Sequence, residues 1–194
     1  MMKQLAGMAT LLAVIAALVL LWDRTRVSTE PLPINTRLGG DVVLTDQHGE
    51  DFDTASLRGK VVLKFFGFTH CPDICPATVA RMSQAYKQLE RWADDIALVF
   101  ISFDPERDTP EHLREYLAWF HEDIIGLTGS EEQLVEVTEK YGAVYMAVGE
   151  DSEGGTNFAH SDFVYLLDRE GRVRKLFPAD VAIEEVVRDV RSLL

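Results

Sequence analysis

Cysteine is scarce in this 194-residue chain, which contains two, Cys71 and Cys75. A small scaffold held by several disulfides is therefore excluded, because such domains are dense in cysteine. Long runs of Lys or Arg are also missing, and the net charge is -13. This charge argues against nucleic acid as a partner, since binding nucleic acid requires a basic surface. The chain has no internal repeat, and its length allows one compact domain and little more.

The N-terminal part of the chain differs in composition from the rest. After a short segment at residues 1–4, residues 5–22 are 18 residues without a charge, at the lower end of what spans a bilayer. Because Trp22 and the charged residues after it do not make a small-residue cleavage site, an uncleaved transmembrane anchor is favoured over a signal peptide. Residues 23–37 form a proline-containing linker, and residues 38–194 form the globular domain.

The globular part alternates strand and helix patterns. Residues 61–66, apart from Lys64, and residues 96–103 are continuous apolar runs, typical of central strands covered on both faces. A helical pattern separates the two runs, which favours parallel pairing. We also expect short edge elements at 41–49 and 50–57, helices beginning near 76, 110, 131 and 183, a loop at 149–157, and a hairpin at 158–168 and 173–177. This order predicts an α/β, thioredoxin-like fold with a central mixed sheet flanked by helices.

Both cysteines lie where a predicted strand turns into a predicted helix. Proline is tolerated at the first helical position, so Pro76 is interpreted as the helix start, with Cys75 at the N-cap and Cys71 in the preceding loop. Thiols near a helix N-terminus have a lowered pKa because unpaired N–H groups and the helix dipole stabilise the thiolate. This position favours reactivity or metal binding.

Three residues separate the two sulfurs, one more than in the common dithiol redox motif. Residues i and i+4 of a helix have Cβ atoms ~5–6 Å apart, whereas a relaxed disulfide requires ~3.5–4.5 Å. A disulfide here needs loop geometry, or it is strained and easily reduced. A metal ion between the sulfurs relaxes that demand, and thiolates select Cu(I), zinc or iron–sulfur clusters. Two sulfurs are an incomplete site for most metals, so a third ligand is expected from elsewhere in the chain.

Four segments carry a resemblance to a known family. They are residues 67–76 around the cysteines, residues 101–110, residues 125–129, and His160 with the following residues 163–168. The chain resembles the Sco/SenC family of membrane-anchored copper proteins over essentially its whole domain.

The resemblance implies a site and a role. In that family two cysteines and a histidine, matching Cys71, Cys75 and His160, bind copper as Cu(I) or Cu(II). The implied function is a copper chaperone that assists assembly of the binuclear copper site in subunit II of cytochrome c oxidase. Another periplasmic copper donor and a thiol reductant are further implied partners. The domain would face the bacterial periplasm or the mitochondrial intermembrane space. The family often has aspartate before the histidine, where this chain has Ala159.

Two enzymatic functions compete with copper delivery. A thiol-disulfide oxidoreductase, which would keep the partner's copper-ligand cysteines reduced, needs Cys71 and Cys75 but not His160. A thiol peroxidase needs a lone low-pKa cysteine with an activating Arg and a Thr or Ser nearby, and Thr69 and Thr78 are the candidates for the hydroxyl residue. His160 therefore discriminates between metal binding and disulfide exchange.

The remaining polar candidates have ordinary explanations. His70 follows Thr69 and precedes Cys71, and adjacent side chains seldom converge on one ion. His48, His112 and His121 are expected to be solvated. Thr109 is expected to be the N-cap of the helix that begins near 110, and Ser130 is expected to open the next helix. Loop geometry and this capping explain the segment that contains Asp104 and Asp108, with a docking surface as the alternative for the two aspartates. Asp162 or a backbone carbonyl would orient the imidazole of His160.

Overall fold

The computed structural model describes residues 31–150 and 154–194. The predicted anchor at 5–22, the segment before it and the linker residues 23–30 lie outside the described residues. Across the described ranges, no helix has both the length and the apolar character needed to cross a membrane. Residues Leu32–Leu194 form one compact unit.

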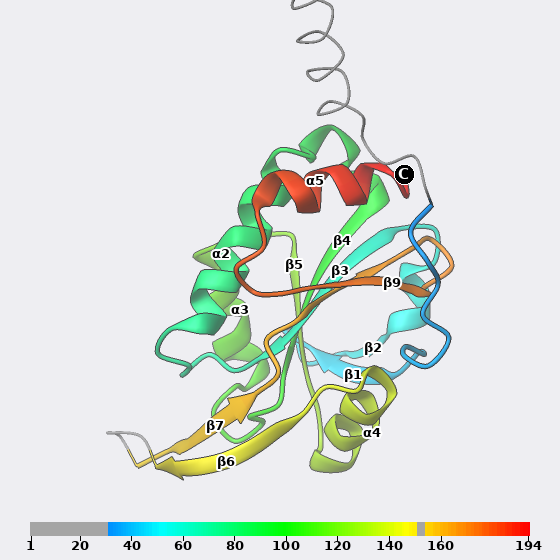
Figure 1. Cartoon of the computed structure of the whole chain (residues 1–194). Coiled ribbons are helices and arrows are strands. Elements are labelled where there is room, and N and C mark those ends of the chain that lie inside the picture. Colours follow the sequence, from blue (N-terminus) through cyan, green and yellow to red (C-terminus); the bar gives the residue numbers. More distant parts are fainter. Residues whose placement is uncertain (1–30, 151–153) are drawn as a thin grey trace, which may run out of the picture. The chain divides into compact units, whose positions relative to one another are not determined.

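The centre of this unit is a seven-stranded mixed sheet with the order β2-β1-β5-β4-β3-β8-β9. Pairing is parallel between β3 and β4 and between β4 and β5, and antiparallel elsewhere (Figure 1). The strands are β1 (Val43–Asp46), β2 (Asp51–Asp53), β3 (Val61–Gly67), β4 (Ile96–Ser102), β5 (Ile124–Thr128), β8 (Val164–Leu167) and β9 (Val173–Phe177). The parallel pairing predicted for the two apolar strands is confirmed, as is the central mixed sheet.

Helices cover the sheet on both faces. They are α2 (Ile74–Lys87), α3 (Pro110–Ala118), α4 (Glu131–Tyr141) and α5 (Ile183–Arg191), with short 3-10 helices at Thr54–Leu57 and Glu90–Asp95. Figure 1 shows α2 and α3 on one side of the sheet and α4 on the other, and α5 packs against α2. Thr109 caps α3 and Ser130 caps α4 through their side chains, as the sequence predicts.

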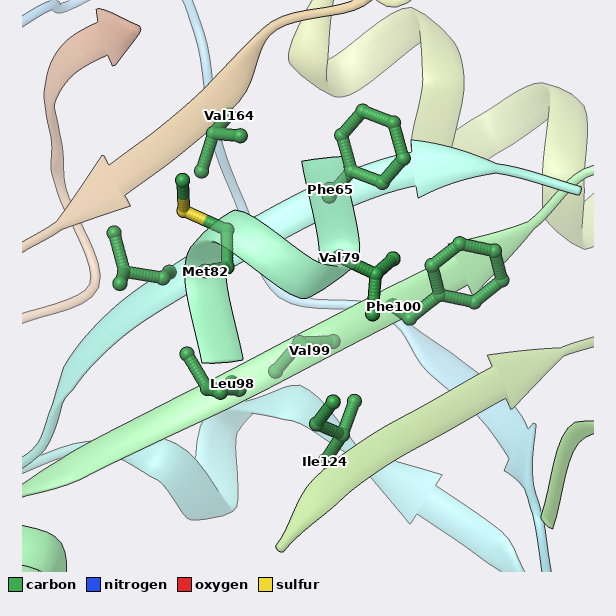
Figure 2. A pocket seen from close by; sticks show the side chains of 9 residues that line it. Phe65, Val79, Met82, Leu98, Val99, Phe100, Ile124 and Val164 are labelled. Atoms are coloured by element: carbon green, nitrogen blue, oxygen red, sulfur yellow. The ribbon is translucent and has the colours of Figure 1, made fainter. Parts of the chain in front are cut away.

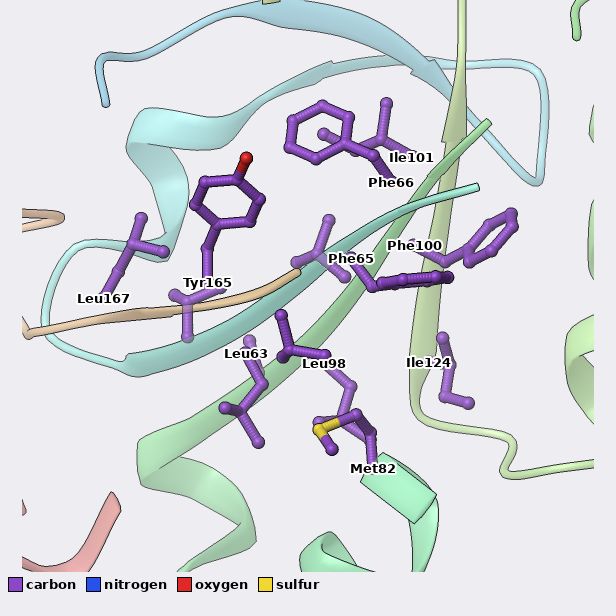
Figure 3. Close-up of a cluster of buried hydrophobic side chains, with 14 of the residues drawn as sticks. Leu63, Phe65, Phe66, Met82, Leu98, Phe100, Ile101, Ile124, Tyr165 and Leu167 are labelled. Atoms are coloured by element: carbon purple, nitrogen blue, oxygen red, sulfur yellow. The ribbon is translucent and has the colours of Figure 1, made fainter. Parts of the chain in front are cut away.

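Strand β3 has side chains buried on both faces. Phe65 points toward α2, where it lines a small apolar cavity with Val79 and Met82 (Figure 2). Phe66 points to the opposite face and packs against Tyr165 with ring centroids 5.5 Å apart (Figure 3). Burial on both faces explains why this strand is a continuous apolar run rather than an alternating one.

Lys64 is the exception in this strand, and it too is buried, with 1% of its surface exposed. Its ammonium donates a hydrogen bond of 2.6 Å to the Tyr141 hydroxyl, which in turn donates to the Gly40 carbonyl oxygen. Burial lowers the pKa of Lys64 to about 7, because the charged form loses its hydration.

A two-stranded sheet that the sequence did not predict lies beside the main one. Strand β6 (Tyr145–Glu150) pairs antiparallel with β7 (Thr156–His160). The predicted loop at 149–157 is therefore too long at both ends, because β6 ends at Glu150 and β7 begins at Thr156. Strand β7 also belongs to this hairpin, whereas the sequence pattern assigned its residues to the next one. Glycine and acidic residues near the turn suggested a loop. The hairpin of β8 and β9 is confirmed.

Candidate metal centre

The turn between β3 and α2 brings both cysteines to one place. Helix α2 begins at Ile74, so Cys75 is its second residue and Pro76 its third. The prediction that Cys75 is the N-cap and Pro76 the first helical residue is wrong by two positions. The first three N–H groups of a helix have no intrahelical acceptor, and the first such bond is donated by Ala77 N to Asp73 O. Proline at the third position therefore removes no hydrogen bond.

Cys71 lies in the loop before the helix, as predicted, and is half-buried. The backbone N–H of Cys75 donates to Cys71 Sγ at 3.5 Å. The pKa of Cys71 is well below its ordinary value, chiefly because the Cys75 thiol donates a hydrogen bond to the Cys71 thiolate, with smaller effects from the contact with His160 and from the backbone N–H groups of Asp73 and Cys75. Cys71 is therefore the thiolate of the pair.

Cys75 has the opposite character. Its side chain is fully buried, and the same hydrogen bond to Cys71, together with burial, raises the pKa of its thiol. The first proton of the dithiol leaves easily and the second is retained, because two adjacent thiolates repel each other. A bound cation would relieve this repulsion and allow both sulfurs to act as thiolate ligands.

His160 reaches the cysteines from the end of β7. Its hairpin is fixed to the domain by aromatic contacts and backbone hydrogen bonds. Phe103 stacks on Tyr145 with centroids 4.7 Å apart and packs against Phe158 at 5.4 Å. The Ser161 N–H donates to the Val144 carbonyl oxygen at 2.8 Å. These contacts determine where the imidazole lies.

The imidazole of His160 presents a lone pair to the sulfurs. Its Nδ1 lies 2.9 Å from the Ser161 carbonyl oxygen, which only accepts, so Nδ1 carries the proton. Nε2 is therefore unprotonated in the neutral ring, and it lies 3.3 Å from Cys75 Sγ. Burial opposes a charge on the ring, but contacts with the Cys71 thiolate and the Ser161 carbonyl outweigh it and raise the pKa of His160. A backbone carbonyl, one of the two predicted partners, orients the ring.

The three candidate ligand atoms lie within 4.8 Å of one another. Phe65, Phe68 and Phe103 surround the imidazole, with ring centroids 6.3, 6.0 and 5.2 Å from it. Two sulfurs and one imidazole nitrogen make a soft donor set, which suits Cu(I) and also zinc. The three phenylalanine rings form an apolar wall beside the imidazole, and Cys71 is the less buried of the two cysteines.

The other predicted polar residues lie in different places. His48 is exposed, as expected, but His112 is half-buried, so its expected solvation is wrong. His121 is also half-buried, with its ring against Tyr86 at 4.9 Å. Asp104 is buried and pairs with Arg107 at 2.6 Å, and Asp108 is fully buried. Neither aspartate is therefore available as a docking surface.

Sequence reasoning missed the aromatic residues that position His160. A continuous apolar run at residues 144–148 is the sequence signal for strand β6, although the side chains of Val144, Met146 and Val148 are exposed. Tyr145 lies between them and turns toward Phe103. A short, continuous apolar run of this kind is typical of a strand.

The chain as a whole is similar to proteins of a known family. The SCO1/SenC family model matches residues 32–194. A SCO2-like protein of Rickettsia conorii is 43% identical over 159 residues, which are 81% of this chain and 78% of that protein.

Solved structures agree with this comparison. The copper-bound structure of Bradyrhizobium japonicum ScoI has a TM-score of 0.75 and 36% identity, and the match covers 81% of this chain and 99% of that one. BsSco, described as a member of the Sco family of cytochrome c oxidase assembly proteins with a disulfide switch, has a TM-score of 0.66 and 28% identity, covering 84% and 95%.

Proposed function

Because the chain belongs to the SCO1/SenC family, we propose that it is a membrane-anchored copper chaperone that binds one copper ion through Cys71, Cys75 and His160. One observation carries the proposal: Nε2 of His160 lies 3.3 Å from Cys75 Sγ, at the start of helix α2 and beside the loop that carries Cys71. The copper-bound state of the similar ScoI structure supports copper as the ion. Copper is here the cargo of the protein.

The proposed acceptor is the binuclear copper site in subunit II of cytochrome c oxidase. The description of BsSco as a member of a family of oxidase assembly proteins supports this partner. Residues 5–22 would anchor the domain to the inner membrane, with the domain in the periplasm or, in a mitochondrion, in the intermembrane space. A periplasmic copper donor and a thiol reductant would complete the cycle.

The difference in exposure between the two sulfurs suggests a route for transfer. Cys75 is buried, and His160 lies behind a wall of phenylalanines, whereas Cys71 is half-exposed. An acceptor thiolate can therefore approach the ion from the side of Cys71, while Cys75 and His160 still hold it. Ligand exchange of this kind needs no free copper in solution.

A titration of the reduced chain with Cu(I), under a competing chelator, tests the proposal. The full chain would be compared with His160→Ala and with His48→Ala, an exposed histidine that serves as the matched control. We expect one tightly bound equivalent in the wild type and in His48→Ala, and affinity at least ten-fold weaker in His160→Ala. Equal affinity in all three proteins would refute the three-ligand site.

A second function, disulfide reduction, is favoured by the unequal thiols. The Cys71 thiolate would attack a partner disulfide, forming a mixed disulfide and releasing one partner thiolate. Cys75 would then attack Cys71 Sγ, closing an intramolecular disulfide and releasing the second partner thiol, so that two electrons pass to the partner. A thiol reductant would restore the dithiol. Trapping of the mixed disulfide by Cys75→Ser tests this step, and no trapped species would argue against it.

A further inference from the structure

A second group of metal-type ligands lies beside the cysteine turn and has no part in the proposed copper site. His70 belongs to the loop between β3 and α2, Asp108 to the loop after β4, and His112 to the first turn of α3. Their ligand atoms lie within 4.8 Å of one another. The rings of His70 and His112 stack with centroids 5.4 Å apart and planes 23° apart.

The hydroxyl of Thr69 occupies the point where these side chains converge. Its oxygen lies 2.5 Å from Asp108 Oδ1, 3.0 Å from His70 Nδ1 and 2.9 Å from His112 Nε2. A hydroxyl has one proton, which it donates to the carboxylate, so both imidazole nitrogens donate to the hydroxyl oxygen. The Thr69 hydroxyl is thus hydrogen-bonded to three side chains of types that bind metal ions, and all three are directed at it.

The distances between the ligand atoms are close to those found around a coordinated ion. Ligand atoms on a tetrahedral ion with bonds of ~2.0–2.1 Å lie about 3.3 Å apart, and His70 Nδ1 is 3.7 Å from Asp108 Oδ1. A small contraction, with the Thr69 hydroxyl rotated aside, would bring the set to coordination distance. Each neutral imidazole would present its lone pair by moving its proton to the other ring nitrogen.

Asp108 supplies a negative charge that is already in place. None of its surface is exposed, and it accepts hydrogen bonds from Thr69 N at 2.9 Å and Ser102 Oγ at 2.5 Å. These two bonds fix Oδ2 and leave Oδ1 directed at the two histidines. A cation at this point would be stabilised by a carboxylate that is already desolvated and oriented in the folded protein.

The donor set selects a different kind of ion from the cysteine site. Two imidazoles and a carboxylate suit borderline divalent cations such as Zn²⁺, Ni²⁺ and Cu²⁺, whereas the two thiolates of the cysteine site favour Cu(I) and also accept zinc. We infer that His70, Asp108 and His112 form a second metal site, specific for a divalent cation of the zinc and copper(II) class. This site goes beyond the proposed function and does not depend on copper binding by Cys71, Cys75 and His160.

Equilibrium dialysis of the reduced, tag-free chain against buffered Zn²⁺ tests the inference. His112→Ala is the main variant, because the side chain is half-buried on a helix and alanine favours helix, and His48→Ala is its matched control. The expected result is one zinc equivalent fewer in His112→Ala than in the wild type and His48→Ala. Because the readout is a difference, it holds whether or not the cysteine site also takes zinc.

A double variant separates this inference from the proposed copper site. In the His160→Ala background, His112→Ala should again remove one equivalent if the second site is real. Equal zinc stoichiometry with and without His112, in both backgrounds, would overturn the inference and leave Thr69 and its neighbours as a hydrogen-bond network only.

A measurement on the unmodified chain guards against misfolding of the variant. Ni²⁺ is paramagnetic and broadens NMR signals of the ligands that bind it. We expect the ring C–H signals of His70 and His112 to broaden at nickel concentrations that leave His48 sharp. Sharp signals from both rings, under conditions in which nickel is bound elsewhere, would contradict the second site.

Discussion

Gly67 lies directly against Cys75, so that a Cβ at Gly67 would stand 2.9 Å from Cys75 Sγ. Carbon and sulfur atoms do not approach this closely without displacement, and the same Cβ would meet Phe65 Cε1 at 2.9 Å. The last residue of β3 thus leaves room for the buried sulfur. The absence of a side chain at Gly67 is therefore a requirement of the site, as the two cysteines are.

The first prediction follows from this contact. Gly67→Ala should push Cys75 Sγ away from His160 and weaken Cu(I) binding about ten-fold, and it should lower the free energy of unfolding by about 1–3 kcal/mol, the usual cost of overpacking. The measurements are a Cu(I) competition titration and urea denaturation.

Gly126→Ala provides the matched control. A Cβ there would meet Leu117 Cδ1 at 2.5 Å, so this variant also overpacks the domain, but on β5 and away from the cysteines. It should lower stability without changing copper affinity. Equal copper loss in the two variants would mean that general destabilisation, and not contact with Cys75, is responsible.

The second prediction concerns the unequal thiols. The pKa of Cys71 is lowered and that of Cys75 raised, and Cys75 is also buried. Iodoacetamide at pH 6 should therefore modify Cys71 of the reduced, metal-free chain and spare Cys75, whereas an ordinary thiol with a pKa of about 8.5 reacts slowly at that pH. Peptide mass mapping measures the two sites separately.

Two comparisons check this explanation. Unfolding in guanidinium should abolish the selectivity, since both sulfurs then become ordinary exposed thiols. Cys75→Ala should slow labelling of Cys71 at pH 6, because the thiolate loses the hydrogen bond that chiefly lowers its pKa. An unchanged rate in this variant would show that the helix N-terminus alone activates Cys71.

The third prediction concerns the buried Lys64. Its pKa is about 7 in the folded protein and about 10.4 in the unfolded chain. At pH values between these two, the unfolded state binds more protons than the folded state, so the free energy of unfolding should rise with pH. Below about pH 7, Lys64 is charged in both states, and its burial keeps the free energy of unfolding low.

Lys64→Met removes the group that causes this dependence. The variant should be more stable than the wild type by about 1–3 kcal/mol near neutral pH, the range for relieving a buried, poorly solvated polar group. Tyr141 keeps its hydrogen bond to the Gly40 carbonyl oxygen. Urea denaturation from pH 6 to 10 measures both proteins, with Lys87→Met, at an exposed lysine, as control. A difference that does not shrink with rising pH would contradict the lowered pKa.

The fourth prediction concerns the hairpin that carries His160. Phe158 packs against Phe68 and Phe103 with centroids 5.3 and 5.4 Å away. Phe158→Ala removes no ligand, yet it should loosen the hairpin and weaken Cu(I) binding about ten-fold. Val148→Ala, at a side chain 57% exposed on the same hairpin, should leave the affinity unchanged. Equal affinity in both variants would mean that the backbone bonds alone position the histidine.

Sequence patterns predicted the strands and helices that bury apolar residues. Strands β3 and β4 are buried on both faces, which produces uninterrupted apolar runs, and Thr109 and Ser130 act as N-caps with the expected side-chain bonds. The start of α2 was misplaced because Pro76 is compatible with any of the first three positions of a helix. Composition alone does not distinguish among these positions.

The candidate site was predicted in part. Cys71 and Cys75 followed from a local pattern, whereas His160 entered through the family resemblance, because 85 residues separate it from Cys75. The half-burial of His112 was not predicted, since it depends on Thr69, which is 43 residues away. Contacts of this kind depend on how the loops pack, and no short sequence pattern encodes them.

The separation of His160 from the cysteines also has a consequence for folding. Strands β4 and β5 and helices α3 and α4 lie between them in the sequence, and the hairpin of β6 and β7 docks on Phe103, directly after β4. Contacts this distant in the sequence are slow to form, since chain entropy must be lost first. Synthesis from the N-terminus makes the two thiols before the histidine, and coordination of an ion by all three ligands requires this distant contact to have formed.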